Sequence, residues 1–208
     1  MALYRFGDRV PRVAPGAWVS DSALVIGDVE IAESCYIGHG AILRGDYGSI
    51  RIGPGTAVEE NATIHIRPDG LSVLGERVTV GHGAILHCNC VGDFAVIGMG
   101  AIVGFDVEVG EWAIVAEGCV VPMGRNVAPG RVVMGVPATD AGEVLERHRA
   151  FWNYGKQLYV DLAARYPHEF ERLDGRAPRR RKRAGTLSAG RGAPSGRRRD
   201  GGGPARRP

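Results

Sequence analysis

The sequence predicts an all-β solenoid of short parallel strands, followed by one C-terminal α-helix. Three observations support this fold class. An apolar residue recurs every six positions through most of residues 1–138, a glycine often follows it, and an amphipathic stretch without this repeat comes next. A period of six fits neither an amphipathic helix nor a simple alternating strand, but it fits a short strand that is followed each time by a turn.

Each repeat unit has two positions that should point inward, a leading aliphatic residue and a small or slim residue four positions later. Glycine after the leader supplies the turn dihedrals. The alternative is a glycine-rich solvated loop region, but the regular register of β-branched leaders argues against it. The leaders are Val19, Val25, Ile31, Ile37, Leu43, Ile52, Val58, Ile64, Ile97, Val103, Val109, Val115, Val121, Val127 and Val133, and the slim residues are Ala23, Val29, Cys35, Ala41, Thr56, Ala62, Ala101, Val107, Ala113 and Cys119.

The repeats of residues 19–138 should form roughly six to seven coils, each rising about 4.8 Å along the solenoid axis. Their stacked Val, Ile and Ala side chains bury a continuous core and leave no aqueous pocket inside. Three breaks interrupt the register, at 44–52, 67–79 and 87–91. Because insertions into a solenoid emerge as loops on its face, often the binding face, we expect the functional site beside these breaks, on an outer face or between subunits.

Half of the six histidines, namely His65, His82 and His87, lie beside these breaks. Three neutral imidazoles suit a catalytic zinc, which takes three protein ligands and keeps one position open; the alternative is three separate surface histidines. His82 follows His65 by 17 residues, close to one coil, so these two should share similar edges of neighbouring coils. His87 should lie one corner further round. Histidines on adjacent faces of one three-sided solenoid do not easily reach the same metal ion. The spacing therefore favours a metal bound between two subunits.

Four stretches of the repeat region are specific enough to compare with known families: GAILRGDYGSIRIG (40–53), EENATIHI (59–66), VTVGHGAILHC (78–88) and GDFAVIGMGAIV (92–103). With them the chain resembles the gamma-class carbonic anhydrase family of the hexapeptide-repeat superfamily, over about its first 170 residues. This resemblance implies a left-handed parallel β-helix. The left hand comes from the resemblance, since the general crossover rule favours right-handed connections.

The resemblance also implies a metal site and an activity. In that family three histidines bind Zn²⁺ or Fe²⁺ between the subunits of a homotrimer, and they correspond to His65 and His87 of one subunit and His82 of its neighbour. The family's Arg-x-Asp motif falls on Arg44 and Asp46, beside the metal. Zinc lowers the pKa of bound water to about 7, so hydroxide would attack carbon dioxide and bicarbonate would leave. Arg44 and Asp46 would orient the reactants, form a structural salt bridge between subunits, or do both.

Several residues depart from the family pattern. Glu59 stands where the family often has Gln; its carboxylate can accept a hydrogen bond from metal-bound water, and its negative charge should raise that water's pKa. Tyr47 replaces a Glu that some members carry after the Arg-x-Asp motif. The short loop between the first two histidines offers only Asp69 and Glu76 as proton relays. Cys88 follows His87 where many relatives have Gly; we interpret it as a small buried core residue rather than a ligand.

The segment 139–173 predicts the helix, which should pack on the solenoid and help to hold a trimer together. Asp140 and Glu143 suggest a capping box at its start, and Pro167 should end it. The expected apolar stripe is Val144, Phe151, Leu158 and Leu162, flanked by Trp152, Tyr159 and Tyr166, with Gly155 as a possible kink. The resemblance makes Tyr159 a candidate contributor to the site, with a core or interface position as the alternative.

The remaining segment, 174–208, differs sharply in composition. Residues 175–208 carry 12 Lys and Arg against one acidic residue, a net charge of +11, whereas residues 1–174 carry 14 against 22, a net charge of −8. Rich in Arg, Gly and Pro and lacking apolar periodicity, this tail should be disordered. It is either a solvated extension or an electrostatic attachment to nucleic acid or another anionic surface.

The rest of the composition limits location and activity. The N-terminus lacks the apolar core of a signal peptide, no apolar run is long enough to span a membrane, and four cysteines without framework spacing suggest reduced thiols in the cytoplasm. The alternative functions are a hexapeptide-repeat acyltransferase using coenzyme A, a metal-dependent thioester hydrolase and a non-catalytic family member. Clustered histidines argue against the acyltransferase, since such enzymes usually use a histidine as a base, and fold alone does not decide.

Overall fold

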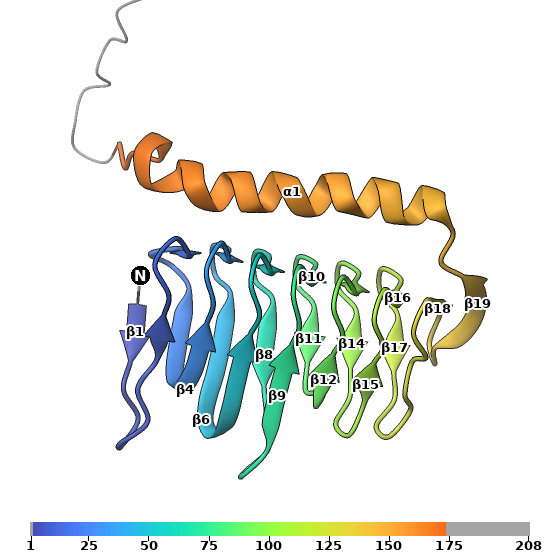
Figure 1. Ribbon diagram of the computed structural model, residues 1–208. Coiled ribbons are helices and arrows are strands. Elements are labelled where there is room, and N and C mark those ends of the chain that lie inside the picture. Colours follow the sequence, from blue (N-terminus) through green and yellow to red (C-terminus); the bar gives the residue numbers. More distant parts are fainter. Residues whose placement is uncertain (1, 174–208) are drawn as a thin grey trace, which may run out of the picture. The chain divides into compact units, whose positions relative to one another are not determined.

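The computed structural model describes residues 2–173. Their fold is a left-handed parallel β-helix of about seven turns, followed by one α-helix (Figure 1), as the hexapeptide pattern predicts. The basic segment predicted to be disordered lies outside the described residues. No helix within residues 2–173 is long and apolar enough to cross a membrane.

The strands are short because each carries one repeat unit, and only two of them run across a corner of the solenoid. In chain order the elements are β1 (Ala2–Tyr4), β2 (Arg12–Val13), β3 (Trp18–Val19), β4 (Leu24–Ile31), β5 (Tyr36–Ile37), β6 (Ile42–Ile52), β7 (Ala57–Val58), β8 (Thr63–His65), β9 (Leu71–Leu74), β10 (Thr79–Val80), β11 (Ile85–Leu86), β12 (Cys90–Val91), β13 (Val96–Ile97), β14 (Ile102–Val103), β15 (Glu108–Val109), β16 (Ile114–Val115), β17 (Val120–Val121), β18 (Arg131–Met134), β19 (Thr139–Glu143) and α1 (Glu146–Glu169).

The strands stack into three faces. The first face holds β3, β5, β7, β10, β13, β16 and β18. The second face holds the first halves of β4 and β6 with β8, β11, β14 and β17, and the third holds their second halves with β9, β12 and β15. Each coil therefore visits the three faces in turn.

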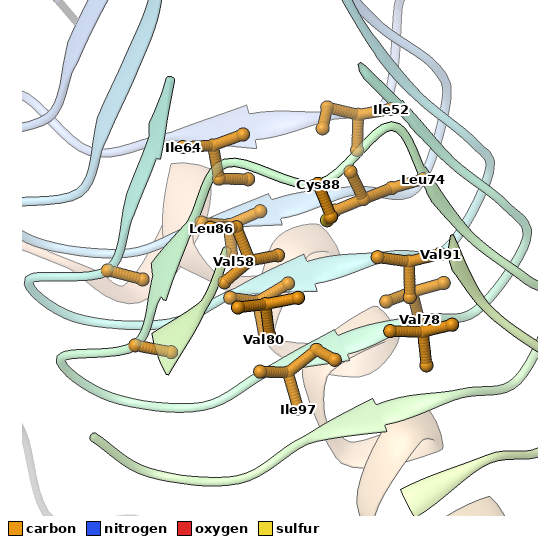
Figure 2. Close-up of a cluster of buried hydrophobic side chains, with 14 of the residues drawn as sticks. Ile52, Val58, Ile64, Leu74, Val78, Val80, Leu86, Cys88, Val91 and Ile97 are labelled. Carbon is orange, nitrogen blue, oxygen red and sulfur yellow. The ribbon is translucent and has the colours of Figure 1, made fainter. Parts of the chain in front are cut away.

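The core is a set of in-register ladders of the predicted leaders. Val58 pairs with Val80 and Val80 with Ile97 on the first face, and these side chains stack at the centre of Figure 2. Every leader and slim residue predicted from the six-residue period is buried. Each fully buried Val, Ile or Leu contributes about 1.5–3 kcal/mol relative to an exposed one, so the repeat itself supplies the main stabilisation.

The first break differs from the loop that the sequence predicts. Residues 44–52 stay within β6, whose two ends both pair with β4. The pairing steps from Gly45 opposite Gly27 to Ser49 opposite Asp28, so three residues bulge out beside the site. Glycine is required inside this bulge, because a Cβ on Gly48 would lie 2.5 Å from Ile66 Cγ2 and 2.6 Å from the Gly70 carbonyl oxygen.

The second break lengthens one coil. Val58 pairs with Val80, which is 22 positions further on, whereas Ile97 pairs with Val115, 18 positions further on. The extra residues form β9 and the turn before it, on the third face. This longer coil decides how the histidines are arranged.

The start of α1 also differs from the prediction. Asp140 and Glu143 belong to β19, which runs antiparallel to β18, and Asp140 accepts hydrogen bonds from Arg131. The helix begins at Glu146, and the backbone N–H of Leu145 donates to His148 Nδ1 at 3.1 Å. Gly155 does not interrupt the helix, and Pro167 lies in its last turn, two residues before its end.

The predicted apolar stripe of α1 is wrong in part. Phe151 and Leu158 are 68% and 45% exposed, whereas Lys156 and Ala163 are the buried residues of α1. Tyr159, Leu162 and Tyr166 of α1 pack with Tyr36 and Ala57 of the first face, and α1 lies along that face in Figure 1. Tyrosine rings and a lysine stem also bury apolar surface, so hydrophobicity alone identified Leu162 correctly but missed Lys156 and wrongly included Phe151 and Leu158.

Candidate metal centre

His65 and His87 stack on successive coils. His65 ends β8 and His87 directly follows β11, and the residues before them, Ile64 and Leu86, are paired in register. Their imidazole rings lie edge to face, with centroids 5.3 Å apart and planes at 88°. Both histidines stand at the corner where the second face ends.

His82 lies at a different corner. It occupies the turn between β10 and β11, where the second face begins. The predicted shared edge of His65 and His82 is wrong, because the coil that separates them has 22 residues rather than about 17. Within residues 2–173 no three His, Cys, Asp or Glu side chains of one chain gather into a metal-binding group.

Arg44 and Asp46 lie beside His65, as the motif predicts. Arg44 pairs with His65 across the strands, and its Nη2 lies 2.7 Å from His65 Nε2. A guanidinium only donates hydrogen bonds, so His65 Nε2 carries a lone pair and its proton is on Nδ1. Asp46 completes the group, with Oδ1 3.4 Å from Arg44 Nε and 3.8 Å from His65 Nε2.

The environment favours the neutral form of both stacked histidines. Burial lowers the pKa of His65 and of His87, and the charge of Arg44 lowers both further. His87 Nδ1 is buried without a hydrogen-bond partner, and the Phe105 ring lies 4.4 Å from the His87 ring. Neutral imidazole is the form that binds metals, so this pair suits two positions of a three-histidine site, for which Arg44 would have to release His65 Nε2.

His82 is half-exposed and stands between two carboxylates. Its Nδ1 lies 2.7 Å from Glu60 Oε2 and its Nε2 lies 3.1 Å from Glu59 Oε2. Burial raises the pKa of Glu59. For Glu60, burial also acts to raise the pKa, but the hydrogen bond from Tyr36 and the interactions with His82 outweigh it and leave the pKa below its usual value.

The structure places Tyr159 with this second group. Its hydroxyl hydrogen-bonds to Glu59, and it does not join the pair of His65 and His87. The sequence did not single out Glu60 or Tyr36. Glu60 could have been found from its position, because it follows Glu59 directly and lies in the turn one coil before His82.

The second face, which separates the two corners, carries exposed aliphatic side chains. Ile85 and Ile102 pair in register and are 39% and 41% exposed. At the far edge of this face a depression of about 260 Å³ is lined by Ile42, Arg44, Thr63, His65 and His87. The face therefore presents an apolar strip with candidate metal-binding histidines at each of its two edges.

No family model matches the chain, but individual proteins do. The chain is 33% identical over 187 residues to "Gamma carbonic anhydrase 2, mitochondrial" of Arabidopsis thaliana, covering 85% of this chain and 67% of that protein. It is 33% identical over 165 residues to the carnitine operon protein CaiE of Escherichia coli K12, covering 79% of this chain and 84% of that protein.

A solved structure agrees with these similarities. The crystal structure of a hexapeptide transferase family protein from Anaplasma phagocytophilum matches with a TM-score of 0.76 and 32% identity, covering 79% of this chain and 98% of that chain. Sequence and fold therefore point to one group of proteins. The chain belongs to the gamma carbonic anhydrase/CaiE-like family of hexapeptide-repeat proteins.

Proposed function

We propose that this protein is a gamma-type metalloenzyme that catalyses the reversible hydration of carbon dioxide to bicarbonate. The site would lie between the subunits of a homotrimer and hold Zn²⁺ or Fe²⁺, with His65 and His87 from one subunit and His82 from its neighbour. One observation carries the proposal. The two stacked histidines and His82 stand at opposite edges of the same face, so one chain holds both halves of a site but does not join them.

Cyclic assembly would join these halves. When two different edges of one surface meet between identical subunits, the contact is heterologous, and a ring forms if the rotation closes. The edge with His82 would then meet the edge with His65 and His87 of the next subunit. The exposed Ile85 and Ile102 between the edges would be covered in such a ring, which supplies an apolar contact for assembly.

The residues around the site suit this chemistry. A bound zinc or iron(II) ion would supply hydroxide at neutral pH. Arg44 would hold and orient the bicarbonate anion, because its guanidinium presents a planar fork of donors. Asp46, 3.4 Å from Arg44 Nε, would fix that fork. Glu59, buried beside His82, would accept a proton or hydrogen bond at the reacting oxygen.

The second candidate is a coenzyme A-dependent acyltransferase. It is favoured by the similarity to the Anaplasma phagocytophilum protein, a member of the hexapeptide transferase family. Such an enzyme would need one histidine as a base and no metal. The paired neutral imidazoles, His65 and His87, favour the metalloenzyme. A metal-dependent thioester hydrolase would share the metal but fail a carbon dioxide hydration assay, and a non-catalytic member would fail every activity assay.

A mixing experiment tests the shared site. His65→Ala trimers and His82→Ala trimers should each lack complete sites, because two imidazoles are too few for a stable three-ligand zinc site. When the two variants are unfolded and refolded together, each mixed ring has one junction with all three histidines. Random mixing at equal amounts makes about three quarters of the rings mixed, so about a quarter of all sites should recover.

The readouts are zinc content by elemental analysis and carbon dioxide hydration rate. Refolding each variant alone provides the control for recovery by other routes. Mass spectrometry shows whether mixed trimers have formed. If they have formed and yet contain no more zinc than the two parent variants, the three histidines do not make a site across subunits. Wild-type protein that takes up neither zinc nor iron(II) would refute the metalloenzyme itself.

A further inference from the structure

Two hydrogen-bonded pairs flank His82, each consisting of a glutamate and a tyrosine. Glu60 and Tyr36 face Nδ1, and Glu59 and Tyr159 face Nε2. We propose that Tyr36 and Glu60 are a positioning pair that holds His82 as the tautomer with its proton on Nδ1, so that Nε2 is the nitrogen presented to the neighbouring subunit. The consequence for metal binding rests on the proposed function, whereas the tautomer itself does not.

The contacts of Glu60 carry the first step. Oε2 lies 2.7 Å from His82 Nδ1, and Oε1 accepts the hydroxyl proton of Tyr36 at 2.7 Å. Both carboxylate oxygens are therefore occupied in fixed directions. The backbone adds to this order, because the Glu60 carbonyl oxygen accepts the N–H of Gly83, the residue after His82. An ionised carboxylate only accepts hydrogen bonds, so His82 Nδ1 must be the donor.

Tyr36 fixes the position of Glu60, because Tyr36 is itself held in place by its neighbours. Its side chain is 2% exposed, and its ring stacks on Trp18 at 4.9 Å and contacts Tyr159 of α1 at 5.1 Å. Burial and the neighbouring carboxylate raise the pKa of Tyr36, so its hydroxyl keeps its proton. A chain of contacts thus connects α1 to His82, from Tyr159 to the Tyr36 ring and from the Tyr36 hydroxyl through Glu60 to His82 Nδ1.

Glu59 is the competing partner, and its geometry is weaker. Its Oε2 lies 3.1 Å from His82 Nε2 and also accepts the backbone N–H of His82 at 3.2 Å. If Glu59 set the tautomer, the proton would sit on Nε2 and that nitrogen would be closed to a metal. The shorter contact to Glu60 favours the opposite state. In metal sites, a carboxylate on the second nitrogen of a ligating histidine fixes the tautomer and the ring orientation.

Nitrogen-15 NMR of histidine-labelled, zinc-free protein tests the tautomer directly. In its neutral form, wild-type His82 should show a protonated Nδ1 and a bare Nε2. The spectrum of His82→Asn assigns the signals. Glu60→Ala should move His82 toward the Nε2-protonated form, and Tyr36→Phe, which keeps the stacked ring, should move it part of the way.

Two results would overturn the inference: a wild-type His82 protonated on Nε2, or a tautomer that Glu60→Ala leaves unchanged. An unchanged tautomer in Tyr36→Phe would remove Tyr36 from the pair. The matched control is Leu162→Ala, which loosens the same helix contact without touching Glu60. It should lower the melting temperature and leave the tautomer as in the wild type.

Zinc affinity, measured by chelator competition, adds a second readout. Glu60→Ala should weaken zinc binding about 10- to 100-fold, the usual effect of removing a partner that orients a ligand, while Leu162→Ala should not. An unweakened Glu60→Ala protein would contradict the consequence for metal binding. If the wild type binds no zinc, the proposed metalloenzyme fails, and the NMR spectra still decide the tautomer.

Discussion

Lys156 places an amine between α1 and the first face, where it is 1% exposed. Its Nζ donates to Thr79 Oγ1 at 3.0 Å and to the Ala95 carbonyl oxygen at 3.1 Å. Burial, aided by the charge of Arg77, lowers the pKa of Lys156 from 10.5 to about 7. A neutral amine in this position joins α1 to the solenoid through hydrogen bonds and leaves no unpaired buried charge.

This pKa predicts a pH dependence of stability. Above pH 7 the folded state has released the Lys156 proton, whereas the unfolded state keeps it up to about pH 10.5. The unfolded state therefore binds more protons, and stability rises with pH in this window, by up to about 1.4 kcal/mol per pH unit. Urea unfolding at pH 7, 8 and 9, at constant protein concentration, should show this rise in the wild type and lose it in Lys156→Met. If the free energy of unfolding changed with pH equally in the wild type and in Lys156→Met, Lys156 would not be a buried, neutral amine.

At the scale of elements, the second face is built differently from the third. Its outward positions carry Ile85 and Ile102, whereas the third face carries Arg51 and Glu30, which form an ion pair with Nε and Oε2 3.3 Å apart. Charged pairs suit a solvated surface, and adjacent exposed isoleucines suit a covered one. If the protein assembles as proposed, this contrast favours the second face as the contact surface.

Ile102→Glu should therefore dissociate the assembly, because a buried unpaired carboxylate is costly. Because Ile102 is 41% exposed in the single subunit and is not part of its core, the variant should still fold as a monomer. Val73→Glu is the matched control, since Val73 is 36% exposed on the third face. Light scattering should give a trimer for the wild type and the control and a monomer for Ile102→Glu. A trimeric Ile102→Glu protein would rule out this face as the interface.

The period of the sequence predicted the strands because inward positions such as Val58 and Val80 depend only on local spacing. It did not predict the corner of each histidine. The residues between His65 and His82 include β9, and no local rule states how many of them the longer coil absorbs. The packed face of α1 was also missed, since the burial of Lys156 depends on acceptors that only the fold supplies.

For the whole molecule, the core and the described candidate residues belong to one compact unit, Met1–Phe170. A chain that ends near Arg172 should therefore fold, assemble and bind metal like the full chain, since it loses mainly the basic segment and no residue of the core. Circular dichroism melting, light scattering and elemental analysis provide the comparison. A truncated protein that became monomeric would assign the segment a structural role that its composition does not suggest.

The antiparallel β19 has a consequence for aggregation. A stack of parallel strands ends in a row of unpaired backbone groups, and such an edge can template the addition of another chain. On the first face that edge would be β18, but β19 folds back and pairs with it in the opposite direction, with an irregular register at Val132 and Val133. The reversed strand does not continue the parallel ladder, so a second solenoid cannot extend that ladder in the same direction at this edge.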